Sequence, residues 1–344
     1  MTALLFLSGC QSLHFYQQAV AGQTRLMLER RSVASLLASD DTDPALHYRL
    51  ELSADILDHA RRAGLPVGDA YQSYVETGET FVIWNVFAAP PFELSLKQHC
   101  FPIAGCVSYR GFFHQADARQ YAAHLSEDGY EVFVGGVRAY STLGWFDDPL
   151  LDTYLFLPEE QLAALLFHET AHRLAYAPGD TRFNESLATT VERYLLESWL
   201  REHGGQDAGS GYERYLAQEK RHGQVVELID GVRERLRAVY AADLSIDEMT
   251  TQKAELLAQM QSDYASLSAS WDEPRPFAGW MKGPINNARL ETVADYHQWV
   301  AGMSRYLQTH GFERFKTELK RLEQLDSEAR LNVLRSWDTA ANPA

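Results

Sequence analysis

The fold is decided by residues 158–177, which read PEEQLAALLFHETAHRLAYA. Pro158 suits the first turn of a helix, and the two Glu residues that follow it complement the positive end of the helix dipole. Within this predicted helix, the HETAH sequence at 168–172 places two histidines four positions apart. That spacing puts both imidazoles on one face at neighbouring heights, so two ring nitrogens can bind one metal ion.

The HETAH sequence also contributes a carboxylate. Glu169 is rotated by about 100° from His168, so it can address a metal-bound water instead of the metal itself. The alternative is that the two histidines lie on the exposed face of an amphipathic helix. Apolar neighbours typical of a buried helix disfavour that alternative. They are Leu165, Leu166, Phe167 and Leu174.

A second helix is predicted over 183–200, FNESLATTVERYLLESWL, after a helix stop and turn at 177–180. His172 lies six and a half positions before the midpoint of the turn's Pro-Gly bond, and Glu185 lies six and a half after it. In an antiparallel helical hairpin these two residues face each other. Glu185 is therefore predicted to complete a His, His, Glu set with an open fourth position, as in catalytic zinc sites. Otherwise, a Glu near a helix start is a surface residue that the helix dipole favours.

The same register predicts which residues support the ligands. Thr189 lies opposite His168, and Glu192 lies one turn further along the second helix. Ligating histidines need a hydrogen-bond acceptor on the ring nitrogen that does not bind the metal. Glu192 is the candidate for this role, and a solvated helix charge is an equally open alternative.

Two sets of motifs resemble known proteins. HETAH at 168–172, followed by NESLA at 184–188, is similar to the gluzincin pattern of HExxH with a later NExxA-type ligand helix, although the separation is shorter than in thermolysin-like peptidases. A wider set of phrases resembles one bacterial family of zinc aminopeptidases. These are FPIAGCVSYRGFF (101–113), AYSTLGWFDDPLL (139–151), FHETAH (167–172), FNESLA (183–188) and NNARL (286–290).

The resemblance implies a zincin-like catalytic core with one Zn²⁺ per chain and a peptide as substrate. Metal-assisted hydrolysis follows, with Glu169 taking a proton from the water and passing it to the leaving amine. An aminopeptidase is the leading hypothesis. The alternatives are an envelope endopeptidase of the same chemistry and a zincin-like lipoprotein that binds partners without catalysis. Structural zinc fits poorly, because closed structural sites favour four protein ligands and Cys.

Several tyrosines are candidates for the donor that stabilises an oxyanion. Tyr140 is preferred because the sequence around it follows a predicted strand that leads toward the metal helix. Tyr109 with Arg110, and Tyr296, also lie in or beside the family-like phrases. With 17 Tyr in the chain, each of them is more often a core or surface residue.

Substrate contacts are predicted on a strand and at a helix start. Residues 131–137 are the candidate for an edge strand that pairs with extended substrate. Asn286 and Asn287 precede a helical run, and capping of that helix is the better-supported role for one of them.

The fold class is predicted to be α+β and predominantly helical, with a small sheet and a long C-terminal helical hairpin. Residues 14–64 read as helical, and so does the chain from 158 onward, where 211–240 and 246–268 form the hairpin. Strands are predicted at 81–87, 106–113 and 131–137, with a helix near 117–125 between the last two.

The chain is expected to form one metallopeptidase domain over 10–344. Its β-containing part covers about 70–150, its metal-binding helices about 158–203 and a helical elaboration about 208–340. The 344 residues carry 47 acidic and 31 basic side chains, a formal charge of −16. This balance disfavours nucleic acid as a partner, because such binders present a basic face. No apolar run reaches the roughly 18 to 20 residues needed to cross a bilayer.

The first residues, MTALLFLSGCQS, predict a location. Leu7-Ser8-Gly9-Cys10 resembles the lipobox of bacterial lipoproteins, in which the signal peptidase cuts before a lipid-bearing Cys. The resemblance implies removal of residues 1–9 and an acyl anchor on Cys10, and Gln11 favours the periplasmic face of the outer membrane. No Lys or Arg precedes the apolar stretch, which points to a start codon upstream of Met1. The alternative is a buried N-terminal segment with an ordinary Cys.

Cys100 and Cys106 are the two remaining cysteines. An oxidising periplasm permits a disulfide between them. Five intervening residues do not match a zinc-knuckle spacing. A pair of reduced, buried thiols is the alternative.

Overall fold

The computed structural model describes residues 5–101, 105–139, 147–203, 208–272 and 275–339. Of residues 5–14, 208–212, 294–297 and 339 only the backbone is described. The helices are α1 (Leu5–Leu28), α2 (Val33–Leu37), α3 (Pro44–Arg62), α4 (Gln115–Glu127), α5 (Asp152–Leu155), α6 (Glu159–Ala171), α7 (Thr181–His203), α8 (Ala208–Ala241), α9 (Ile246–Ser268), α10 (Ala278–Met281), α11 (Asn287–His297), α12 (Val300–His310), α13 (Phe312–Glu323) and α14 (Ser327–Thr339).

The strands are β1 (Arg31–Ser32), β2 (Ser73–Val75), β3 (Ile83–Ala89), β4 (His99–Phe101), β5 (Gly105–Val107), β6 (Arg110–Phe112), β7 (Glu131–Val137) and β8 (Leu150–Leu151). Helices dominate the described residues, and the strands form three small sheets, so the protein is α+β and predominantly helical. No helix in the described part of the chain is both long enough and apolar enough to span a membrane.

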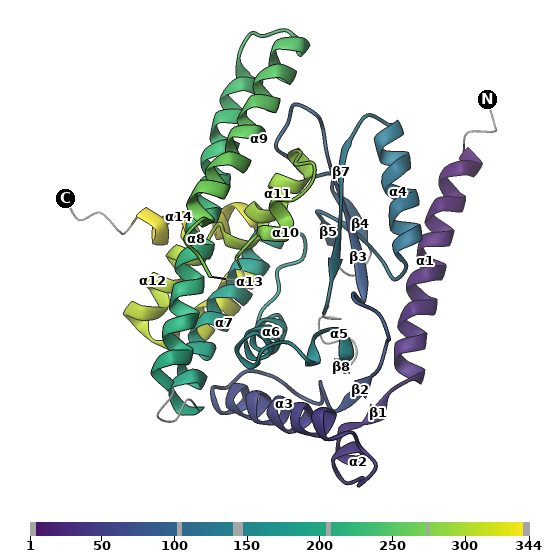
Figure 1. Ribbon diagram of the computed structural model, residues 1–344, viewed down its shortest axis with the longest axis vertical. Coiled ribbons are helices and arrows are strands. Elements are labelled where there is room, and N and C mark those ends of the chain that lie inside the picture. The colour runs from purple at the N-terminus through teal and green to yellow at the C-terminus, as the bar shows by residue number, and fades with distance from the viewer. Residues whose placement is uncertain (1–4, 102–104, 140–146, 204–207, 273–274, 340–344) are drawn as a thin grey trace.

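The central sheet has the order β6-β3-β7, and both pairings are antiparallel. Side chains alternate between its two faces, as they do along any strand. Val86 and Ala88 of β3 pack with Ala118 and Ala122 beneath α4 on one face. The other face, called the open face below, is contacted by α11 and is directed toward the α6–α7 pair (Figure 1). β7 occupies one edge of this sheet, and its bounds are those predicted from the sequence.

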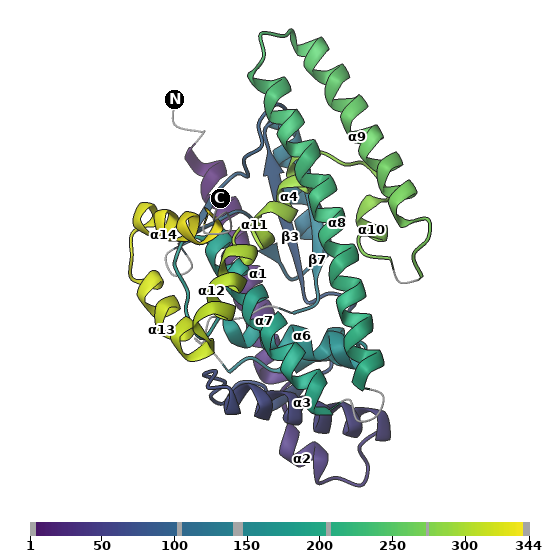
Figure 2. The same cartoon turned by 90° about the vertical axis from the view of Figure 1, so that its left-hand side faces the viewer.

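The largest core joins α3, α6 and α7 to the C-terminal helices. Leu166 and Phe167 of α6, Phe183 and Leu187 of α7, and Phe315 of α13 are fully buried in it. The α8–α9 hairpin extends past this body and has its own apolar cluster with α11 (Figures 1 and 2). The core therefore holds the two predicted metal helices between elements from both ends of the chain.

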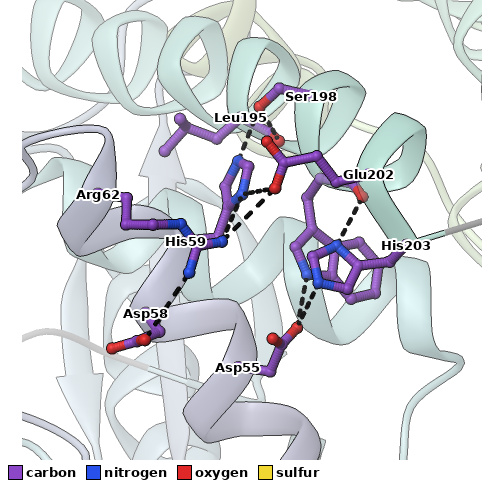
Figure 3. A network of polar contacts seen from close by, with 9 residues as sticks. Asp55, Asp58, His59, Arg62, Leu195, Ser198, Glu202 and His203 are labelled. Atoms are coloured by element: carbon purple, nitrogen blue, oxygen red, sulfur yellow. Dashed lines mark hydrogen bonds and ion pairs between the residues drawn. The ribbon is translucent and has the colours of Figure 1, made fainter.

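A polar network also fixes α7 against α3 (Figure 3). The buried His59 of α3 lies with Nε2 2.8 Å from Oγ of Ser198 and Nδ1 3.1 Å from Glu202. Nε1 of Trp199 donates to Asp55 at 3.1 Å, and Nε2 of His203 lies 3.1 Å from the same carboxylate. These contacts hold the C-terminal half of α7, so its N-terminal half is presented to the site at a fixed angle.

Three predicted elements differ from the observed ones. The strand predicted at 81–87 lies two residues later, as β3 (Ile83–Ala89). The strand predicted at 106–113 is two strands, because β5 ends at Val107 and pairs with β4, whereas β6 begins at Arg110 and pairs with β3. Helix α6 ends at Ala171, about one and a half turns before the predicted stop at 177–180. Its last turn is tightened by bonds from Arg173 N to Thr170 O and from Leu174 N to Ala171 O, which span three residues as in a 3₁₀ turn.

A disulfide joins Cys100 of β4 to Cys106 of β5. Replacing both cysteines with Ser is expected to lower the free energy of unfolding by about 2 kcal/mol, because the closed loop is short and its closure restricts the unfolded chain only moderately. Urea unfolding of the double variant beside the oxidised parent measures this difference. Equal midpoints and slopes for the two proteins would contradict the prediction.

His99 of β4 makes stability depend on pH. Burial, together with Arg110 and Lys97, lowers the pKa of His99 to about 4. The unfolded chain takes up the proton near pH 6.5 and the folded chain does not, so stability is complete above about pH 6.5 and falls as the pH drops toward 4. When the pH falls from 7 to 4.5, the free energy of unfolding of both proteins is expected to drop. The drop should be about 1–2 kcal/mol smaller for His99→Gln than for the parent. Parallel pH dependences in urea titrations would show that His99 has no such effect.

Candidate metal centre

The bend between α6 and α7 is held by one side chain. Nδ2 of the buried Asn184 donates to the carbonyl of Ala177 at 2.9 Å, and its Oδ1 accepts from the N–H of the same residue at 2.8 Å. Gly179 has φ +81°, a conformation that suits glycine, and it lets the chain reverse between the helices. Because Asn184 precedes Glu185, the residue that fixes the bend also fixes the start of the ligand helix.

Three side chains converge from the two helices. Nε2 of His168 lies 3.3 Å from Oε2 of Glu185, and Nε2 of His172 lies 3.8 Å from the same oxygen. One ligand atom from each residue lies within 4.8 Å of the other two. Ligands about 2.0–2.1 Å from a tetrahedral zinc are separated from one another by about 3.3 Å. The spacing and the N, N, O donor set therefore fit a zinc ion.

Glu192 bonds the other nitrogen of His168. Its Oε2 lies 3.0 Å from Nδ1, which leaves Nε2 directed toward Glu185. Burial alone lowers the pKa of His168, but the two carboxylates outweigh it and raise the pKa well above its ordinary value. Thr189 lies buried on α7, between Glu185 and Glu192 in the sequence. The side chain that bonds the His168 ring is that of Glu192.

His172 is in a different electrostatic environment. Burial lowers its pKa to about 4, and Nδ1 has no hydrogen-bond partner among the described residues. The ring is therefore neutral at pH 7, which is the state in which an imidazole binds a metal.

Glu169 lies beside the three convergent groups without joining them. Burial raises the pKa of its carboxyl to about 7, and the negative charges of Glu185 and Asp148 act in the same direction. A carboxyl with a pKa near the working pH is suited to accept and return a proton. Glu169 also lines the cavity described next, so substrate can reach it.

A cavity of about 440 Å³ lies between the metal helices and the open face of the central sheet; it is called the metal cavity below. Its walls include the four residues of the candidate centre that face it, namely His168, Glu169, His172 and Glu185. Tyr109, which the sequence singled out, lines it as well.

Tyr176 also lines the metal cavity, and the sequence interpretation missed it. Burial raises the pKa of its phenol, and the charge of Glu185 adds to that effect, so the hydroxyl stays protonated as a hydrogen-bond donor. Tyr176 follows His172 by four positions, so on the predicted helix it lies on the face that carries His168 and His172. This spacing is the signal by which the sequence could have identified it.

Other predicted site residues lie elsewhere. The guanidinium of Arg110 is 4.0 Å from the ring centre of Phe15 and 4.7 Å from that of Tyr121, and it does not line the metal cavity. The alternation of β6 explains this placement, since neighbouring residues of a strand face opposite sides. Arg110 therefore lies outside the metal cavity, and the prediction that it contacts substrate there is wrong.

Asn286 and Asn287 hold α11 in place. Oδ1 of Asn286 caps the helix by accepting from Arg289 N at 2.9 Å, and its Nδ2 donates to Val132 O at 2.9 Å. The fully buried Asn287 donates to the carbonyls of Pro90, Pro91 and Glu93 and accepts from Tyr240. Both side chains bond the surrounding backbone and hold α11 in place. Neither lines the metal cavity, so the prediction that they contact substrate there is wrong.

Three of the predicted residues cannot be placed. Tyr140 and the side chains of Tyr296 and Cys10 lie outside the described residues. The region around Tyr140 begins directly after Ala139, which lines the metal cavity.

Comparison with known proteins adds one finding. A family model described as "Putative aminopeptidase" matches residues 14–334, which is most of the chain. Searches of curated proteins and of solved structures found no match.

Proposed function

Because the chain belongs to this aminopeptidase family, we propose that it is a zinc-dependent metallopeptidase that releases amino-terminal residues from peptides. The observation that carries the zinc assignment is the convergence of His168, His172 and Glu185, with Glu169 beside them in the same cavity. A zincin-like core, in which a small sheet covers the paired metal helices, belongs to this proposal.

His168, His172 and Glu185 would hold the zinc. When bound there, zinc supplies Lewis acidity, which polarises a carbonyl and lowers the pKa of water. Glu169 accepts the proton of the attacking water and returns it to the leaving amine. Glu192 keeps the His168 ring in one tautomer and one orientation. Tyr176 lines the metal cavity and can donate its phenol proton to the oxygen of the scissile carbonyl, and Tyr109 is a second candidate for this role.

A digest of a peptide library, read by mass spectrometry, tests the proposal. Stepwise loss of residues from the amino end, abolished by a chelator and restored by zinc, is the expected result. Internal cleavage with the same metal dependence would replace the aminopeptidase with an endopeptidase of the same chemistry. A chain that binds zinc but cleaves nothing would favour the non-catalytic alternative, against which the retained Glu169 argues.

The lipobox-like sequence extends the proposal to location. An acyl anchor on Cys10 would place the enzyme at the bilayer, on the periplasmic face of the outer membrane. Palmitate labelling of the full chain in cells is expected to disappear in Cys10→Ser. Label that persists in this variant would remove the anchor from the proposal.

A further inference from the structure

A second cavity adjoins the metal cavity along the open face of the central sheet. Its volume is about 330 Å³, and it shares two wall residues with the metal cavity, Asn85 and Val137. Four aromatic side chains line its walls, namely Phe87 of β3, Phe133 of β7, Phe277 and Trp280. Every residue that lines it is uncharged, so it is suited to an apolar group. It is called the aromatic cavity below.

The aromatic walls are held in position by their neighbours. The guanidinium of Arg289 lies 4.9 Å from the ring centre of Phe133 and 5.3 Å from that of Trp280. Phe277 stacks on His222 with 4.8 Å between ring centres and meets Trp280 edge-on at 5.8 Å. A wall fixed in this way does not collapse when the cavity is empty.

At Gly135 of β7 the ring of Phe133 lies close against the strand, at the wall of the aromatic cavity. The register places Gly135 beside Asn85 on the open face of the sheet. A Cβ at this position would lie 3.2 Å from the ring of Phe133 and 4.0 Å from that of Phe87. Any longer side chain would therefore occupy the cavity.

Asn85 lies where the two cavities meet, and the oxygen of its amide has no partner in the part of the chain that the structure describes. The residue is only 6% exposed, and Oδ1 has no hydrogen-bond partner among the described residues. A buried polar atom without a partner costs free energy, so it calls for an explanation. A donor on the substrate would satisfy it.

Resting on the proposed function, we propose that the aromatic cavity binds the side chain of the amino-terminal residue and that Asn85 binds the amino group of that residue. The Cα of such a residue carries three groups. Its carbonyl goes to the metal cavity, its amine to Asn85 at the junction, and its side chain to the aromatic cavity. The enzyme then selects peptides that begin with a large apolar or aromatic residue.

Aminoacyl-coumarin reporters with Phe, Leu, Ala, Glu or Lys test the side-chain subsite in the full, zinc-loaded chain. We expect kcat/KM to be at least about tenfold higher for Phe and Leu than for Ala, since each buried methylene contributes to discrimination, and lowest for Glu and Lys. Gly135→Val is expected to lower the Phe-to-Ala ratio at least about tenfold by filling the cavity. A preference for charged residues, or an unchanged ratio in this variant, would overturn the subsite.

Trp280→Ala keeps the subsite testable if Gly135→Val does not fold. Removing the indole takes apolar contact away from a large side chain of the substrate and leaves β7 unchanged. The Phe-to-Ala ratio of kcat/KM is therefore expected to fall in this variant too. An unchanged ratio in a folded Trp280→Ala protein would count against the proposal. The matched control is Gly223→Ala on α8, where an added Cβ meets nothing within 4 Å.

Asn85→Ala separates recognition of the amine from recognition of the side chain. KM is expected to rise about tenfold for every reporter, with the Phe-to-Ala ratio unchanged, since the variant removes one hydrogen bond to a charged group. Because Oδ1 has no partner to lose, the melting temperature should not fall. An unchanged KM, or a loss of stability that accounts for the lost activity, would remove this role from Asn85.

Direct binding distinguishes failure of the subsite from failure of the proposed function. The tripeptides Phe-Gly-Gly and Ala-Gly-Gly are titrated calorimetrically into the Glu169→Gln protein. Tighter binding of Phe-Gly-Gly supports the subsite, even if the parent protein hydrolyses nothing and the peptidase assignment fails. Hydrolysis by the parent with equal binding of the two tripeptides would overturn the subsite and leave the peptidase assignment intact.

Discussion

Glu169→Gln is expected to lower kcat/KM for hydrolysis of aminoacyl reporters by about a thousandfold or more. Positioned proton transfer contributes about 10²–10⁴ to a rate, and Gln has nearly the shape of Glu but cannot accept the proton. Zinc content should stay the same, since Glu169 is not among the three convergent ligand groups. Steady-state kinetics with metal analysis of the same samples measure both quantities.

The matched control is Glu160→Gln, in the first turn of the same helix and away from the metal cavity. Its kcat/KM is expected to equal that of the parent. Full, chelator-sensitive hydrolysis by Glu169→Gln would show that this carboxylate is not the base.

Removing one of the three ligands is expected to abolish metal binding. The parent, purified with zinc and dialysed, should hold about one zinc per chain, and His168→Ala or Glu185→Ala should hold almost none. Binding of the ion to the folded state also raises stability, so zinc should increase the melting temperature of the parent and not that of these variants. Atomic absorption and thermal unfolding, each with and without zinc, measure the two effects.

Glu192→Gln provides a graded comparison. This residue contacts His168 on the nitrogen that faces away from the ligand set, so its loss should weaken zinc binding by about 10–100-fold and not abolish it. Retention of stoichiometric zinc by Glu185→Ala would show that the convergence of the three groups has another cause.

The convergence of His168, His172 and Glu185 could be predicted from the sequence because its geometry is local. Four residues separate the histidines on one helix, and a tight bend sets the register of Glu185 on the next, so periodicity and a turn are enough. The bounds of β7 and α9 also agree with the prediction, which rested on a run of β-branched and aromatic residues and on dense helical charge, and α8 begins three residues before its predicted start.

Other features depend on packing between distant segments. The bend after α6 is held by the side chain of Asn184 on the next helix, which bonds the backbone of Ala177, and no local pattern records that contact. The break between β5 and β6 depends on which neighbour each strand pairs with. The aromatic cavity combines β3, β7 and the region from α10 to α11, so no motif of contiguous residues could have predicted it.

The buried carboxylate of Glu291 limits how relatives of this enzyme can diverge. Glu291 of α11 is 1% exposed, bonds Arg233 of α8 at 2.8 Å and lies 3.7 Å from Arg182 of α7. Loss of this anion would remove the buried partner of Arg233 and leave the pairing of that cation to the half-exposed Asp230, so drift at this position is costly. Its neighbours Thr292 and Val293 face the aromatic cavity and carry no such constraint. If the proposed subsite is correct, natural variants with a different preference for the amino-terminal residue should therefore differ at Thr292 and Val293 and keep Glu291.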